Sequence, residues 1–134
     1  MKNIRKLTSD KYWDYELGYW WFSDVSRFGK VLSHVELYKQ IMNLPGTIAE
    51  FGVYKATSLI RWLSLREIFE TSPTRKIIGF DAFGPFPTKD LKEVKSDLNF
   101  IQNFEKEGGD GLSIEETETI LKAKSFTNYE LIDG

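Results

Sequence analysis

The sequence predicts an α/β fold with a parallel sheet, and three observations carry this prediction. Residues 47–51 form a short apolar run bounded by turn residues, which suits a buried strand. Apolar side chains then recur at helical spacing over residues 58–69, and a second apolar run, residues 76–81, follows. Strand, helix and strand thus succeed one another over about 35 residues, the length of a βαβ unit with a parallel crossover.

The other elements follow from periodicity and from turn residues. A helix is predicted before the first strand, and Pro45 and Gly46 end it. Ser113 and Glu116 have the spacing of a capping box at the start of a later helix. The predicted segments are a helix over 27–43, a loop over 83–87, a helix within 91–104, a flexible turn at 108–111, a helix over 113–123 and a third strand at 129–132.

Composition narrows the class of protein. The chain has 134 residues, 41% of them hydrophobic, which suits one globular domain. Its net charge of −2 gives no electrostatic reason to expect nucleic acid or an anionic membrane as a partner. With no cysteine, the chain has no disulfides, thiolate zinc sites or cysteine nucleophiles. We see no signal peptide and no apolar run of the roughly 18–20 residues that span a bilayer, so we expect a soluble cytoplasmic protein.

The first 27 residues are expected to form an arm separate from the domain over residues 28–134. Residues 10–28 are dense in aromatic side chains. One interpretation is an arm or short helix that packs on the domain, because aromatic side chains mostly serve burial. The other is a substrate lid or a dimer contact, because aromatic residues are enriched at interfaces. A homo-oligomer is therefore left open.

Candidate binding residues stand where the predicted strands end. Parallel α/β sheets bind ligands beyond the carboxyl ends of their strands. Glu50 stands at the end of the first strand, and Gly52 behind it lets the backbone approach a ligand closely. Ser58 opens the next helix, whose free N–H groups favour a carboxylate. Asp81 ends the second strand, the usual position of the acceptor for ribose hydroxyls in nucleotide-binding folds.

Three motifs resemble the macrocin O-methyltransferase family, whose members methylate sugar hydroxyls. Residues 46–55 resemble its first motif, residues 78–83 with Phe86 and Pro87 its second, and residues 129–134 the start of its third. The resemblance implies a Rossmann-like class I methyltransferase that uses S-adenosylmethionine. The positions that it implies around this cofactor are Glu50, Gly52, Tyr54, Ser58, Asp81 and Phe83.

The chain departs from the family pattern in two places and is expected to lack part of the sheet. The family has a glycine pair where this chain has Ala56 and Thr57, and Glu-Gly where it has Gly84 and Pro85. The resemblance implies that the third strand lies outside the second and that the strands beyond the first come later in the family. We therefore expect an N-terminal portion of about three strands, with residues 47–51 as an edge strand. The family's magnesium-binding aspartates and acceptor pocket belong to the later portion.

The leading hypothesis is methyl transfer from S-adenosylmethionine to a hydroxyl of a sugar or sugar-containing metabolite. Glu50 and Ser58 would hold the methionine end and Asp81 the ribose, with no catalytic base and no metal ligand assigned. A nicotinamide-dependent oxidoreductase is the alternative on the same fold, although the sparse glycines after Gly52 argue against a pyrophosphate. A truncated, non-catalytic paralogue that binds a partner through the aromatic arm is the third hypothesis.

Overall fold

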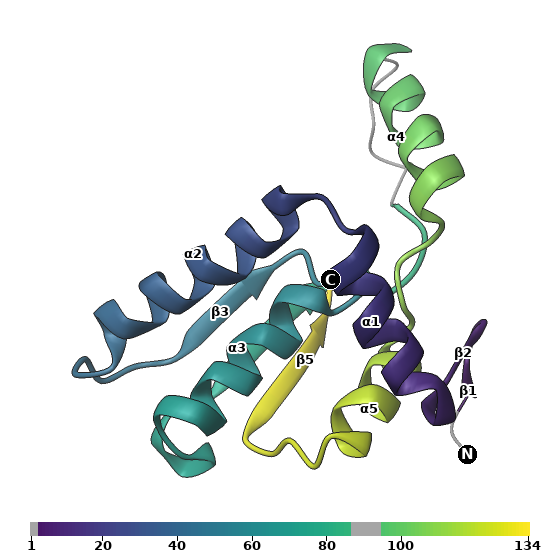
Figure 1. Cartoon of the computed structure of the whole chain (residues 1–134). Coiled ribbons are helices and arrows are strands. Elements are labelled where there is room, and N and C mark those ends of the chain that lie inside the picture. The colour runs from purple at the N-terminus through teal and green to yellow at the C-terminus, as the bar shows by residue number, and fades with distance from the viewer. Residues whose placement is uncertain (1–2, 87–94) are drawn as a thin grey trace. The chain divides into compact units, whose positions relative to one another are not determined.

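The computed structural model describes residues 3–86 and 95–134 of the chain, and Figure 1 follows their path. Two compact units are present, Met1–Gln40 and Ile41–Gly134, and each is treated by itself below. The predictions for residues 91–94 and for Pro87 lie outside the described residues.

The second unit contains a three-stranded parallel sheet. Its strands are β3 (Ile48–Phe51), β4 (Ile77–Asp81) and β5 (Tyr129–Asp133), in the order β3-β4-β5. Phe51 pairs with Phe80, and Asp81 pairs with Asp133, so the carboxyl ends of the strands meet at one edge. The order confirms the predicted arrangement, in which the second strand, β4, lies between the first, β3, and the third, β5.

Three α-helices and a short 3₁₀-helix connect the strands of the second unit. They are α3 (Thr57–Phe69), η2 (Ser72–Thr74), α4 (Lys95–Gly108) and α5 (Ile114–Ala123). The predicted capping box of α5 is present, because the Glu116 amide donates to Ser113 Oγ at 3.1 Å and the Ser113 amide donates to Glu116 Oε2 at 2.9 Å. Together the two bonds satisfy two amides that the first turn of a helix leaves without an intrahelical acceptor.

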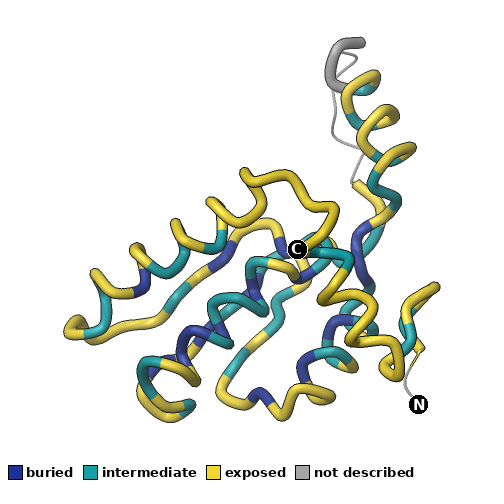
Figure 2. The backbone as a smooth tube through the Cα atoms, in the orientation of Figure 1, coloured by how far each residue is buried: buried dark blue, intermediate teal, exposed yellow. Residues whose placement is uncertain are grey.

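The core of the second unit lies between α3, the sheet and α5. Leu59 and Leu63 of α3, Ile77 of β4 and Leu121 of α5 are fully buried, and Figure 2 shows buried positions along α3 and α5. Burying one such side chain contributes about 1.5–3 kcal/mol. This packing fixes α3 beside the sheet and therefore sets the position of its first turn at the carboxyl end of β3.

Strand β3 is an edge of this sheet, as predicted. The rings of Phe51 and Phe80 stack with centroids 4.9 Å apart across the β3–β4 pair. Phe51 is nevertheless 79% exposed. Natural proteins usually cover an edge strand or place charged side chains on it, and the exposed Phe51 on β3 departs from this pattern.

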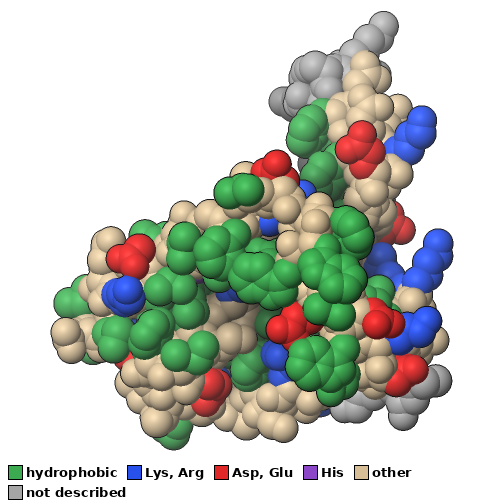
Figure 3. Space-filling model, in the orientation of Figure 1, with side chains coloured by type: hydrophobic (Ala, Val, Ile, Leu, Met, Phe, Trp, Pro, Cys, Tyr) green, Lys and Arg blue, Asp and Glu red, His purple; other side chains and the backbone are tan. Residues whose placement is uncertain are grey.

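The first unit is a small hairpin followed by helices rich in exposed aromatic side chains. Its elements are β1 (Asn3–Ile4), β2 (Leu7–Thr8), η1 (Ser9–Lys11), α1 (Tyr12–Phe22) and most of α2 (Val25–Ile41). The Asp24 carboxylate accepts the Ser26 amide at 2.9 Å and so helps to start α2. None of the residues of α1 is buried, and Trp21 and Phe22 are 66% and 83% exposed. Figure 3 shows hydrophobic side chains on the surface in this view. Among the described residues no helix is both long and apolar enough to cross a membrane.

Candidate functional site

Glu50 and Ser58 meet at the carboxyl end of β3. Glu50 is only 9% exposed, and Ser58 Oγ donates to its Oε1 over 2.6 Å. The serine lies in the first turn of α3, where backbone N–H groups have no intrahelical acceptor. A buried carboxylate at the end of β3 thus meets a hydroxyl at the positive end of the α3 dipole.

The backbone between these two residues leaves space at Gly52 and is strained at Ala56. Gly52 has a φ of +91°, and a Cβ placed there would meet no atom within 4 Å. That combination lets a ligand approach the main chain directly. Ala56 precedes α3 with a φ of +56° and is fully buried. Ala56 therefore holds a left-handed conformation that glycine adopts more readily.

Asp81 joins the loops that follow β3 and β4. Its Oδ2 accepts the Tyr54 amide at 2.9 Å, and its Oδ1 accepts the Phe83 amide at 2.8 Å. Tyr54 and Phe83 both have left-handed backbones, with φ of +50° and +45°. An ionised carboxylate has about four acceptor positions, so two remain for a further donor such as a ribose hydroxyl.

The structure brings the six predicted cofactor residues to one edge of the sheet, with different roles. Glu50, Ser58 and Asp81 place polar side chains at this edge, whereas Gly52 places only its backbone there. The remaining two, Tyr54 and Phe83, each donate a backbone amide to Asp81. Whether all six contact a cofactor stays a prediction.

The sequence did not predict the hydrogen bonds that join this edge of the sheet to Gly108 and Gly109. The Lys55 ammonium donates to the Gly108 carbonyl, and the Tyr54 hydroxyl donates to the Gly109 carbonyl at 2.8 Å. The predicted flexible turn is therefore hydrogen-bonded to the β3–α3 loop. No local pattern predicts a contact between residues more than fifty positions apart, although two consecutive glycines do indicate a close approach of backbone.

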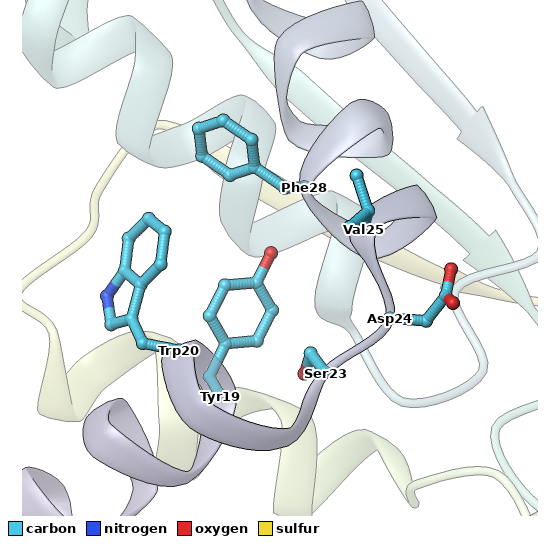
Figure 4. Close-up of a pocket in the computed structure, with 6 residues that line it drawn as sticks. All are labelled: Tyr19, Trp20, Ser23, Asp24, Val25 and Phe28. Atoms are coloured by element: carbon cyan, nitrogen blue, oxygen red, sulfur yellow. The ribbon is translucent and has the colours of Figure 1, made fainter.

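A shallow pocket of about 210 Å³ lies within the first unit. Figure 4 shows its rings, Tyr19 and Trp20 from α1 and Phe28 from α2, with the Asp24 carboxylate directed away from them. That carboxylate already accepts the Ser26 amide. The lining offers an apolar surface but no set of converging polar groups, so the edge beside Asp81 is the better candidate site.

Metal-binding geometry is not seen in the described part of the chain. No group of three or more His, Asp or Glu side chains there is arranged to hold an ion. The magnesium that the resemblance implies stays a prediction.

Comparison with known proteins gives structural neighbours but no family. A scan against protein-family models gave no match, and a search of curated proteins gave none. The solved structures that match include the apo structure of CalS11, a TDP-rhamnose 3'-O-methyltransferase of calicheamicin biosynthesis, and a second structure of CalS11, described as a calicheamicin methyltransferase. The TM-scores are 0.53 and 0.56, the sequence identities 21% and 22%.

The described residues have part of the Rossmann-like fold of CalS11, a three-stranded parallel sheet with helices. Both matches cover 96% of this chain but 48% and 51% of the CalS11 chains, so the chain spans about half their length. Identity at this level establishes the shared fold and not a shared activity. It does agree with the sequence-based prediction of a three-stranded part of such a sheet.

Proposed function

We propose that this chain is the cofactor-binding half of an S-adenosylmethionine-dependent O-methyltransferase of the macrocin O-methyltransferase type. The observation that carries the proposal is the meeting of Glu50, Gly52 and Asp81 at the carboxyl edge of one parallel sheet. Ligands of such sheets bind in this position. The fold shared with CalS11 supports methyl transfer over other uses of the same edge.

The residues present suit the parts of the cofactor. The Glu50 carboxylate would accept hydrogen bonds from the methionine ammonium. The free N–H groups in the first turn of α3, beside Ser58, would favour the methionine carboxylate. Gly52 leaves open space where the ligand would lie against the backbone. Asp81 keeps acceptor capacity for the ribose hydroxyls after its two amide bonds. When bound, the cofactor supplies an electrophilic methyl group.

A hydroxyl of a sugar or sugar-containing metabolite is the proposed acceptor. The support is the activity of CalS11, a methyltransferase of TDP-rhamnose. An acceptor hydroxyl must lose its proton during transfer, and we assign no base for this step to residues of this chain. The acceptor pocket is proposed to belong to a later portion of a longer enzyme.

Calorimetric titration of the 134-residue chain with S-adenosylhomocysteine tests the proposal, with NADH as the comparison ligand. We expect S-adenosylhomocysteine to bind and NADH to bind at least about 10-fold more weakly, because the loop lacks the glycines that a pyrophosphate needs. Stronger binding of NADH would instead favour the oxidoreductase hypothesis. If neither ligand binds, the cofactor claim is wrong.

Two variants locate the binding. Glu50→Gln removes the charge that faces the ammonium, and we expect about 10-fold weaker binding or more, the usual effect of losing a charge-assisted hydrogen bond. Ser58→Ala removes the hydroxyl that orients Glu50, and we expect a smaller loss of about 3- to 10-fold. Ser64→Ala, further along the same helix, is the matched control and should bind like the parent chain.

A further inference from the structure

The 108–112 segment, which joins α4 to α5, is bound to the loop between β3 and α3 at three points. The Tyr54 hydroxyl donates to the Gly109 carbonyl at 2.8 Å, and the Lys55 ammonium donates to the Gly108 carbonyl. In the opposite direction, the Leu112 amide donates to the Tyr54 carbonyl at 2.8 Å. Two of the three bonds use Tyr54, one through its side chain and one through its backbone.

The contact is close and leaves no room for a side chain at Gly108 or Gly111. A Cβ at Gly111 would lie 2.7 Å from the carbonyl oxygen of Gly84, which is backbone and cannot move aside cheaply. A Cβ at Gly108 would collide with the Tyr54 hydroxyl. The segment therefore packs against both loops at this edge of the sheet, the one after β3 and the one after β4.

Aromatic packing extends the contact to α4. The Tyr54 ring lies 5.3 Å from the Phe104 ring, and Phe104 meets Phe86 edge to face at 5.6 Å. The Phe86 amide also donates to Glu105 Oε1 at 3.3 Å. The last turns of α4 are thus joined to both loops that flank Asp81.

Tyr54 contacts the segment and the candidate site at the same time. Its amide donates to Asp81 Oδ2, while its carbonyl and hydroxyl bond to the 108–112 segment. Its φ of +50° is a conformation that residues other than glycine adopt rarely and only where the surroundings hold them. The bonds on either side of the residue supply that constraint.

We propose that Tyr54 is a positioning residue that couples the 108–112 segment to the cofactor half-site. Its hydroxyl fixes the left-handed backbone at the β3–α3 loop, and this backbone orients the Asp81 carboxylate toward the ligand. Because coupling between two sites is reciprocal, a bound cofactor must also strengthen the bonds to the segment. The inference rests on the proposed function for the identity of the ligand but not for the coupling itself.

Hydrogen exchange with and without S-adenosylhomocysteine tests this on the parent chain, Tyr54→Phe and Tyr129→Phe. Tyr54→Phe keeps the ring and removes only the hydroxyl; Tyr129→Phe makes the same change at the other end of the sheet and is the control. We expect Tyr54→Phe to raise exchange of the amides at 109–112 about 3- to 10-fold and to weaken ligand binding by a similar factor. In the parent chain, the ligand should slow exchange at 109–112, which a merely structural contact would not do.

Two results would overturn the coupling. One is that Tyr54→Phe binds S-adenosylhomocysteine as tightly as the parent chain does, while the ligand leaves the exchange of the 109–112 amides in the parent chain unchanged. The other concerns a parent chain that binds no ligand at all, which would overturn the proposed function but leave the coupling to be tested by exchange alone. Unchanged exchange of the amides at 52–56 in Tyr54→Phe would then reject the coupling, and faster exchange there would support it. Lys55→Met takes the place of Tyr54→Phe, with the same expectations, if the latter does not fold.

Discussion

The Tyr54 amide donates a hydrogen bond to Asp81 Oδ2 across 2.9 Å, and this contact joins the loops that follow two neighbouring strands. The other oxygen of Asp81 accepts the Phe83 amide. Asp81 therefore has a structural role at the edge of the sheet in addition to its proposed role toward the ribose. Such a double role makes this carboxylate the most informative position for substitution.

Replacing this acid by its amide should destabilise the edge. Asparagine keeps one acceptor atom and turns its NH₂ toward either the Tyr54 or the Phe83 amide. We expect Asp81→Asn to lower the free energy of unfolding by about 1.5–3 kcal/mol, the usual contribution of a hydrogen bond to a charged group. Urea unfolding measures the change. Asp133→Asn, at the paired position of β5, is the control, and equal losses in the two variants would contradict the assigned role.

Ala56 offers a test of the strained loop start. A left-handed backbone costs a residue other than glycine about 1–2 kcal/mol. Ala56→Gly removes that cost but loses a buried methyl group, about 0.8 kcal/mol, and makes the unfolded chain more flexible. We expect these terms to offset one another to within about 1 kcal/mol. Ala56→Val should lower the free energy of unfolding by at least about 2 kcal/mol, because a β-branched side chain is excluded from this backbone and the site is fully buried. Comparable stability of the two variants by thermal unfolding would refute this.

Arg66 should be the most sensitive position at the amino ends of the strands. It is fully buried and donates to the carbonyls of Arg75, Thr127 and Asn128 at 2.6–3.0 Å. Arg66→Met leaves these acceptors buried without that donor, so we expect a loss of about 3–5 kcal/mol in urea unfolding. Arg61→Met in the same helix is the matched control. A loss under about 1 kcal/mol at Arg66 would show that other groups satisfy these carbonyls.

Glu67 should make part of the stability depend on pH. The Ser72 hydroxyl, and after it the Arg66 guanidinium, hold the pKa of Glu67 below its usual value in spite of partial burial. The folded state therefore binds the proton less readily than the unfolded state does. The contribution is present above the ordinary glutamate pKa and is lost as pH falls through the lowered one. We expect Glu67→Gln to flatten the decline in stability below about pH 5. Glu107→Gln, at an exposed position of α4, should retain the decline of the parent chain.

The arrangement of elements could be predicted from the sequence, because it depends on local patterns. The strand over Ile48–Phe51 and the helix over Thr57–Phe69 begin and end within a residue of their predicted limits. Apolar runs and helical spacing determine such elements, and proline and glycine mark their ends. The order of the three strands came from the resemblance and is confirmed. The short hairpin of β1 and β2 was missed, since two-residue strands carry no periodicity.

The contacts that complete the candidate site could not be predicted in the same way. Sequence placed Glu50, Ser58 and Asp81 near one edge, but not the hydrogen bond between the first two or the two amides on Asp81. These contacts depend on backbone conformations at Tyr54 and Phe83 that ordinary residues rarely adopt. The buried Arg66 gave a weak signal, because helical spacing places it on the same face of α3 as the buried leucines of that helix.

The most direct test of the half-site is a map of amide chemical shifts in the 134-residue chain during titration with S-adenosylhomocysteine. Nuclear magnetic resonance detects even weak binding by a half-site, and a chain of 15.6 kDa is small enough for it. The account predicts that the largest shifts fall on the amides of residues 52–58 and 81–83, at the ends of β3 and β4. Shifts confined to the aromatic helices of the first unit, or no shifts at millimolar ligand, would contradict it.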